Sequence, residues 1–306
     1  MRTLAPFIPV QLPAMNQPAN ILDGQKCADA VISAVRTAIE AHVEGGGRRP
    51  GLAVVLVGED PASSIYVRAK RQDCEKAGIL ARDFDLPDTT TQEELLALID
   101  RLNADPQVDG VLVQLPLPEQ IDQNAITNSI HWSKDVDGFH AYNVGKLALR
   151  QPGLRPCTPR GVMTLLAFHG IKVIHKHVVV VGASNIVGRP MTLELLYKGA
   201  TVTVAHRFTR DLESLVRQAD ILISAMGKRG IINSDWIPSG CIVVDVGINR
   251  MDDGKITGDI DFESAARKAS LISPVPGGVG PMTRATLMQN TAEAAGLNIE
   301  ICGEGD

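Results

Sequence analysis

Residues 178–190 read VVVVGASNIVGRP, a run of four valines followed by a loop of small residues that lies between Gly182 and Gly188. A helical pattern begins at Met191, so the segment predicts a strand, a glycine turn and a helix in succession. Such a turn directs free backbone N–H groups and the positive end of a helix toward a diphosphate. The spacing differs from the usual G-x-G-x-x-G, and an ordinary βα connection is the alternative interpretation.

The segment after the next predicted strand, 201–205, favours a nucleotide site. It reads HRFTR (206–210), with one histidine, two arginines and no acidic residue. In dinucleotide-binding folds an acidic residue about 20 positions on binds the ribose of NAD, whereas an arginine accommodates the 2′-phosphate of NADP. A guanidinium binds a phosphate bidentately, and a carboxylate repels it. A solvated basic loop is the alternative. We predict NADP as the cofactor, with Ser184 and Arg189 near its phosphates, Arg207 near its 2′-phosphate, and His206 as a further contact.

Composition places the chain among ordinary globular proteins. Of its residues, 44% are hydrophobic and 21% are charged. Its length of 306 residues suggests two domains. The net charge of −5, with no long basic run, argues against nucleic acid and anionic membranes as partners. Apolar runs fall short of the roughly 18–20 residues of a membrane span. Unclustered cysteines predict reduced, buried thiols in a cytoplasmic protein without disulfides or a metal site. The five are Cys27, Cys74, Cys157, Cys241 and Cys302.

The first 20 residues differ in character from the rest. They are apolar but contain four prolines and a single arginine, so they lack the continuous apolar core of a signal peptide. We expect a flexible N-terminal extension over 1–20.

Strand and helix patterns alternate along the remaining chain, which predicts an α/β protein with parallel sheets. We expect two α/β domains with the active-site cleft between them, the second domain having a Rossmann-like doubly wound sheet. Residues 134–159 show turn residues without a sustained period, so the boundary is placed at 151–155. The expected domains are 21–152, completed by a C-terminal helix in 283–306, and 153–282. Expected helices are 21–41, 63–77, 91–103, 191–198 and 283–295; expected strands are 52–57, 82–86, 111–114, 178–181, 201–205, 221–224 and 242–245.

A candidate catalytic group lies in the first half. Tyr66 and Lys70 are four residues apart on a predicted helix and therefore share one face. Gln114 ends a predicted strand, and ligands of open α/β sheets bind at the carboxyl ends of the strands. The three side chains are expected to converge there. Taken singly, each has an ordinary alternative: a half-buried tyrosine, a solvated lysine and a strand-end glutamine.

Two loops offer further candidates. Asp135 and Asp137 lie in KDVDG (134–138), which lacks the later ligands of a calcium-binding loop. They are either caps of a turn or acceptors for paired N–H donors of a heterocycle. The proline- and glycine-rich loop 274–281 is either a rigid wall of the cleft or a hinge that leads into a helix.

With these features in place, the chain resembles the bifunctional methylenetetrahydrofolate dehydrogenase/methenyltetrahydrofolate cyclohydrolase family, in its bacterial form. The resemblance extends from residue 21 to residue 296. The motifs on which it rests are ASSIYVRAK (62–70), DGVLVQLPLP (109–118), KDVDGFH (134–140), RPCTPRG (155–161), GASNIVGRP (182–190), DVGINR (245–250) and PVPGGVGPMT (274–283).

The resemblance implies a homodimer that binds folate in the cleft, oxidises 5,10-methylenetetrahydrofolate with NADP and hydrolyses the methenyl product to 10-formyltetrahydrofolate. Two positions depart from the family pattern: relatives often carry a lysine where this chain has Gln72 and a small or aliphatic residue where it has Arg284. Neither departure removes a motif residue, so we expect them to affect ligand affinity more than activity. The implied catalytic residues are Tyr66, Lys70, Gln114 and Asp137; the implied substrate contacts are Tyr66, Asp137, Pro276, Gly277 and Gly278; and the implied nucleotide contacts are Gly182, Ala183, Ser184 and Ile248.

The two reactions need different help from the protein. Hydride transfer depends on orientation, since no proton is lost, whereas hydrolysis needs a proton shuttle. Lys70 is the candidate shuttle, because a cationic substrate and desolvation both disfavour its ammonium form. Three alternatives stay open: a shikimate-dehydrogenase-like NADP oxidoreductase, a non-catalytic nucleotide sensor or scaffold, and a dehydrogenase without hydrolase activity.

Overall fold

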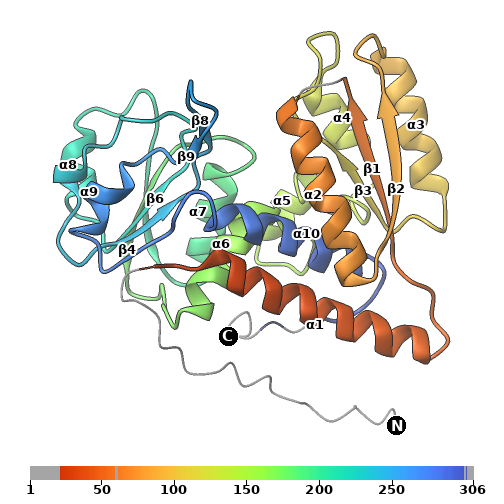
Figure 1. Cartoon of the computed structure of the whole chain (residues 1–306), viewed down its shortest axis with the longest axis horizontal. Coiled ribbons are helices and arrows are strands. Elements are labelled where there is room, and N and C mark those ends of the chain that lie inside the picture. Colours follow the sequence, from red (N-terminus) through yellow and green to blue (C-terminus); the bar gives the residue numbers. More distant parts are fainter. Residues whose placement is uncertain (1–20, 59–60, 300, 302–306) are drawn as a thin grey trace.

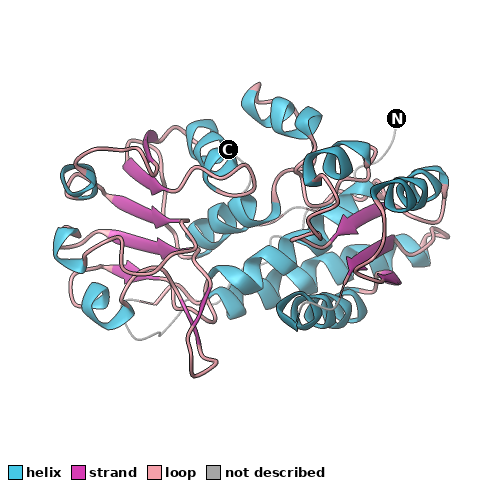
Figure 2. Ribbon diagram, turned by 90° about the horizontal axis from the view of Figure 1, so that it is seen from above, coloured by secondary structure: helices cyan, strands magenta, loops and turns pink. Residues whose placement is uncertain are grey.

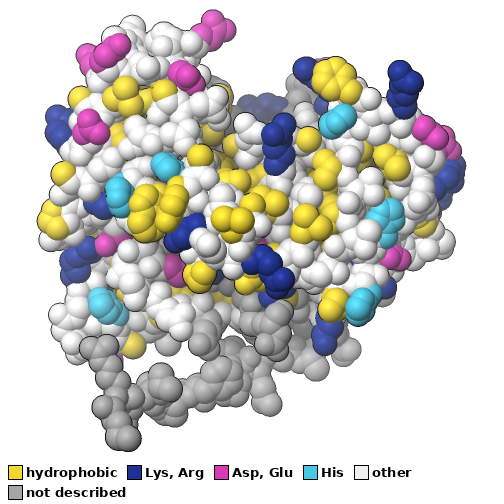
Figure 3. Space-filling view, turned by 180° about the vertical axis from the view of Figure 1, so that it is seen from behind, with side chains coloured by type: hydrophobic (Ala, Val, Ile, Leu, Met, Phe, Trp, Pro, Cys, Tyr) yellow, Lys and Arg dark blue, Asp and Glu magenta, His cyan; other side chains and the backbone are white. Residues whose placement is uncertain are grey.

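The computed structural model describes residues 21–58, 61–299 and 301, and no side chain of 61–66 is among those described. The expected extension over 1–20 and Cys302 therefore lie outside the described residues. Two lobes, each with its own parallel sheet, lie on either side of a set of long helices (Figure 1). The space-filling view shows a notch between the lobes (Figure 3). None of the described helices combines the length and hydropathy that a membrane span requires.

The first sheet has the order β2-β1-β3. Its strands are β1 (Gly51–Val57), β2 (Leu80–Leu86) and β3 (Gly110–Val113). All seven residues of β1 are buried, as a continuous apolar run in a parallel strand predicts. Alternate residues of β1 face different clusters, because side chains alternate across a strand. Leu52, Val54 and Leu56 pack with α1 (Gly24–Glu44) and α2 (Pro61–Ala77), while Ala53, Val55 and Val57 pack with α3 (Gln92–Ala104) and α4 (Gln123–Ser129).

The second sheet has five parallel strands in the order β10-β7-β6-β4-β5. The chain leaves β4 for β5 on one side and later returns to β6 on the other. This reversal is the topological switch point at which doubly wound sheets bind ligands. The predicted α/β class with a Rossmann-like second sheet is confirmed (Figure 2). The strands are β4 (His177–Val181), β5 (Thr201–Ala205), β6 (Ile221–Ser224), β7 (Ile242–Asp245) and β10 (Leu271–Ile272). The other elements of this lobe are α7 (Gly188–Tyr197), α8 (Leu212–Val216), η1 (Ser234–Trp236), the hairpin β8 (Asn249–Arg250) and β9 (Ile256–Thr257), and α9 (Phe262–Ala266).

Long helices connect the lobes. α10 (Val279–Ala294) packs against α1, α2 and α6 (Cys157–Phe168), and one hydrophobic cluster contains strand residues of both sheets together with these helices. Polar contacts reinforce the packing: the buried Arg160 guanidinium of α6 donates to Asn290 Oδ1 and to the Glu293 carboxylate of α10, each at 2.7 Å. The central position of α10 means that its first turns face both lobes.

The predicted element pattern omits several elements, including α4, α6, α8, α9 and β10, and misplaces the start of another. Residues 134–159 contain α5 (Ala141–Ala148) and the start of α6, although no regular structure was expected there. A helix of eight residues is too short to show a clear period. The last long helix begins at Val279, four residues before the predicted start. Pro281 is compatible with that start because N–H groups of the first turn have no partner within the helix.

Candidate active site in the cleft

Lys70 and Gln114 meet at the carboxyl end of the first sheet. Lys70, on α2, is only 7% exposed, and its Nζ donates to Gln114 Oε1 at 3.0 Å. Gln114 follows β3 directly, and its backbone N–H donates to the Val55 carbonyl of β1. Its side-chain amide donates to the Leu115 carbonyl at 2.7 Å, which fixes the orientation of Oε1 toward the lysine. The predicted convergence of these two side chains is therefore present. Tyr66 lies on α2 one turn before Lys70, but its side chain is outside the described residues.

The two aspartates of the KDVDG loop have different surroundings. Asp135 is 1% exposed, and its carboxylate accepts hydrogen bonds from the N–H groups of Gly138, Phe139 and His140 and from Asn143 Nδ2. Asp135 is thus the anchor of the loop, which agrees with the turn interpretation for this residue. Gly138 has φ +76°, and a Cβ there would overlap the Arg155–Pro156 backbone, so the loop requires glycine at this position.

Asp137 projects from this anchored loop. No hydrogen bond to its carboxylate comes from the residues that the structure describes, although its backbone carbonyl accepts from Cys157 N at 3.2 Å. Burial raises the pKa of Asp137 to about 6; the positive charge of Lys70 opposes this and the negative charge of Asp135 adds to it. A desolvated carboxylate that accepts no hydrogen bond from the described residues is suited to accept N–H groups of a ligand.

A cavity of about 670 Å³ lies over the switch point of the second sheet. Six of the seven predicted nucleotide contacts line it: Gly182, Ala183, Ser184, Arg189, His206 and Arg207. Lys228 adds a further positive charge to the lining, and no acidic residue of the described chain lines this cavity. Phe208, also in the wall, has its ring 4.6 Å from the Arg207 guanidinium.

Glycines make the floor of this cavity possible. Gly182 has φ +126°, and a Cβ there would overlap the Ala225 carbonyl of the neighbouring β6 end. A Cβ on Gly188 would overlap the Gly182 carbonyl. Between them, Ser184 Oγ accepts the Val187 N–H at 3.2 Å, which folds the loop back toward the start of α7. The backbone of the loop can therefore approach a ligand as closely as in a G-x-G-x-x-G turn.

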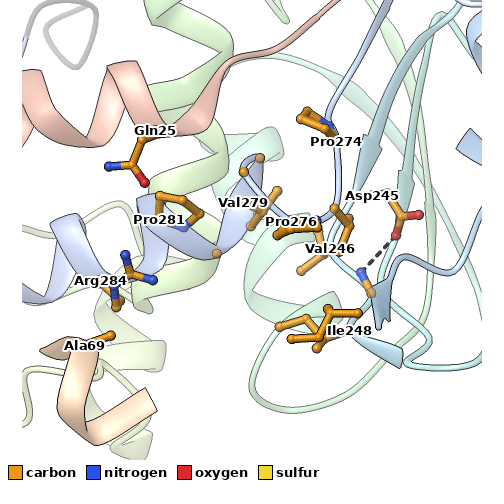
Figure 4. A pocket seen from close by; sticks show the side chains of 16 residues that line it. Gln25, Ala69, Asp245, Val246, Ile248, Pro274, Pro276, Val279, Pro281 and Arg284 are labelled. Carbon is orange, nitrogen blue, oxygen red and sulfur yellow. Dashed lines mark hydrogen bonds between the residues drawn. The ribbon is translucent and has the colours of Figure 1, made fainter. Parts of the chain in front are cut away.

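Another cavity, of about 470 Å³, lies where the lobes meet (Figure 4). The predicted substrate contacts Pro276, Gly277 and Gly278 line it, together with Ala69, the neighbour of Lys70. Ile248 lies here and does not line the nucleotide cavity with the other predicted cofactor contacts. The structure therefore separates Ile248 from the six predicted nucleotide contacts that share the other cavity.

Two buried aspartates that sequence reasoning did not single out support both cavities. Asp245 accepts from the N–H groups of Gly247, Asp259 and Ile260, and burial raises its pKa to about 6 despite these bonds. Asp259 accepts from Ser224 Oγ and from the N–H groups of Met226 and Gly227. Asp245 begins the DVGINR motif (245–250), whereas no motif or pattern in the sequence indicates Asp259.

Comparisons with known proteins agree with this geometry. A family model described as the tetrahydrofolate dehydrogenase/cyclohydrolase catalytic domain matches residues 22–137, and the model for the NAD(P)-binding domain of the same family matches residues 156–299. A bifunctional methylenetetrahydrofolate dehydrogenase/cyclohydrolase from Campylobacter jejuni is 49% identical over 90% of this chain and 98% of its own, with a TM-score of 0.88. The Trypanosoma brucei enzyme, solved with NADP and an inhibitor, is 36% identical over 91% of this chain and 98% of its own, with a TM-score of 0.86.

A more distant likeness bears on one of the alternatives. Shikimate dehydrogenase from Thermus thermophilus is 16% identical over 82% of this chain and 96% of its own, with a TM-score of 0.51. At this identity the likeness extends to the fold alone.

Proposed function

The chain belongs to the tetrahydrofolate dehydrogenase/cyclohydrolase family, enzymes of one-carbon folate metabolism, and from this premise we propose how its residues divide two reactions. The first oxidises 5,10-methylenetetrahydrofolate to the methenyl cation with NADP. The second hydrolyses that cation to 10-formyltetrahydrofolate. The observation that carries the proposal is the 3.0 Å contact between Lys70 Nζ and Gln114 Oε1, nearly buried at the ligand-binding edge of the first sheet.

The residues over the second sheet fit NADP. The glycine loop leaves room for a diphosphate, with Ala183 and Ser184 presenting the backbone of the turn. Arg207 and Lys228 supply positive charge for a 2′-phosphate. When bound, NADP supplies the hydride acceptor. The task of the protein in that step is to hold the two reactants in one orientation, which alone accounts for much of a rate enhancement.

Hydrolysis uses the first-lobe residues. Water adds to the methenyl carbon, and its proton passes to the Lys70 amine as the C–O bond forms. The amine then returns a proton to the ring nitrogen as the C–N bond breaks, and the hydroxyl group of the adduct releases its remaining proton to solvent as the C=O bond of the formyl group forms. Gln114 suits this role, because a neutral amide orients Nζ without favouring the ammonium form as a carboxylate would. Asp137 accepts paired N–H groups of the pterin, and Tyr66 offers its ring to the aminobenzoyl group.

The same proposal covers the organisation of the molecule. We assign folate binding to residues 21–152 together with the C-terminal helix, and NADP binding to residues 153–282. This boundary lies between the end of α5 and the start of α6. We propose a homodimer from the family resemblance. We propose a cytoplasmic location because the four described cysteines are buried free thiols.

A spectrophotometric assay on the purified protein tests the function. With 5,10-methylenetetrahydrofolate and NADP, the methenyl chromophore should form and then decay. Formation without decay would indicate a dehydrogenase that lacks hydrolase activity. No reaction with the folate, in a protein that binds NADP, would favour an oxidoreductase of another metabolite or a non-catalytic sensor.

Arg207→Ala should reduce the preference for NADP over NAD by about tenfold, because the substitution removes a charge-assisted contact to the 2′-phosphate. The measurement is kcat/KM for each nucleotide. Arg210→Ala is the matched control: Arg210 is exposed in the same loop but does not line the cavity. An unchanged preference in Arg207→Ala would assign phosphate recognition to another group, with Lys228 the next candidate.

A further inference from the structure

The cavity between the lobes has an unusual wall. Most of its lining is apolar, including Val246, Ile248, Pro276 and Val279. Asp245 also lines it, but its carboxylate is occupied by three backbone N–H groups. Among the described residues that line this cavity, Arg284 is therefore the one with a positively charged side chain. Figure 4 places it beside Ala69, across the cavity from Ile248.

Arg284 is held in place from behind. Its Nε donates to Asp73 Oδ2 at 2.6 Å, an ion pair that links α10 to α2. The Asp73 side chain is 5% exposed, whereas that of Arg284 is 21% exposed. Among the described residues, no partner is found for the two terminal amino groups of the guanidinium. The pair thus fixes the direction of the side chain and leaves its remaining donors available on the cavity side.

We propose that Arg284 binds a carboxylate of the glutamate moiety of the folate substrate. The proposal rests on the function proposed above. A guanidinium held by Nε still has donors that match a carboxylate, and the apolar wall around it can cover the aminobenzoyl ring that carries the glutamate. Lys70, one residue from Ala69, lies on the same helix turn as this end of the cavity, so a ligand that reaches the lysine with its reactive end passes Arg284.

The test compares two substrates in one background. One is 5,10-methylenetetrahydrofolate, and the other is its diamide, in which both glutamate carboxylates are neutral amides. For the wild type, the KM of the diamide should exceed that of the folate by about tenfold, as expected for a hydrogen bond to a charged group. Arg284→Gln should raise the folate KM to about the diamide value. Its KM for the diamide and its kcat should stay at wild-type values.

Controls separate binding from structure. Arg284→Gln leaves the buried Asp73 with Lys76 at 3.6 Å as its remaining ion-pair partner, so the variant Asp73→Asn/Arg284→Gln is needed as well. It removes the orphaned charge and should show the same KM pattern. Arg36→Gln is the matched surface control, because Arg36 forms a similar pair with Glu40 on α1, away from this cavity; both KM values should be unchanged.

The outcomes are distinct. A wild type that turns over neither substrate contradicts the proposed function. If the wild type turns over both substrates with equal KM, the result contradicts the proposed role of Arg284 but leaves the proposed function intact. Equal losses for both substrates in Arg284→Gln and in the double variant would make Arg284 a brace between α2 and α10, which also overturns the proposal.

Discussion

Lys70→Met is expected to reduce hydrolysis of 5,10-methenyltetrahydrofolate by about a thousandfold, the typical contribution of a positioned proton-transfer group. Methionine has a similar length, so the packing of α2 is kept while the amine is lost. Hydride transfer loses no proton to the protein, so the dehydrogenase activity should fall much less. The measurement is the decay of the methenyl chromophore after subtraction of the uncatalysed rate, alongside the initial rate of its formation.

The same helix offers a control. Lys76 is 59% exposed and pairs with Asp73, so Lys76→Met removes a lysine of α2 without touching the Gln114 contact. It should leave hydrolysis unchanged. Gln114→Glu keeps the lysine but places a carboxylate against it, which favours the ammonium form and should also slow hydrolysis. Normal hydrolysis in a folded Lys70→Met protein would remove the amine from the mechanism.

The parts of the site that the sequence predicted depend on local pattern and on parallel strands. β4 and β5 pair in register, Val181 opposite Ala205, so the loops that follow them begin side by side. Ser184 and Arg207 therefore reach one cavity although 23 residues separate them in sequence. Lys70 and Gln114 meet for the same reason, because β1 and β3 end at the same edge.

What the sequence left open depends on contacts between distant segments. The Arg284–Asp73 pair joins residues 211 positions apart, and no period or motif indicates it. Asp259 follows a short hairpin, and its importance is visible only in the fold, where four donors from two segments surround its carboxylate. The two aspartates of KDVDG are alike in sequence, and only the folded loop shows which one is consumed by internal donors.

Asp137→Asn is expected to raise the KM for the folate substrate by about a hundredfold, since an amide replaces two charge-assisted acceptors with one neutral acceptor. The pKa of about 6 adds a pH dependence. As the pH falls through 6, the carboxyl group becomes protonated and the wild-type kcat/KM should decline with it. Because Asn carries no charge at any of these pH values, that inflection should be absent from the residual activity of the variant. An unchanged folate KM would return Asp137 to the role of a turn residue.

The same carboxyl group should lower stability at neutral pH. Its pKa is about 6 in the folded chain against an ordinary value of 3.8, so between these values the folded state binds more protons than the unfolded state. Its ionised form therefore opposes folding above pH 6, and the effect disappears as the pH falls toward 4. Asp137→Asn should raise Tm by a few degrees at pH 7.5 and by less at pH 5. Asp135→Asn should do the opposite and cost about 1–3 kcal/mol, because the loop donors lose an acceptor. Thermal unfolding of the three proteins at both pH values checks this, and a lower Tm for Asp137→Asn at pH 7.5 would mean that the carboxylate has stabilising partners within the fold.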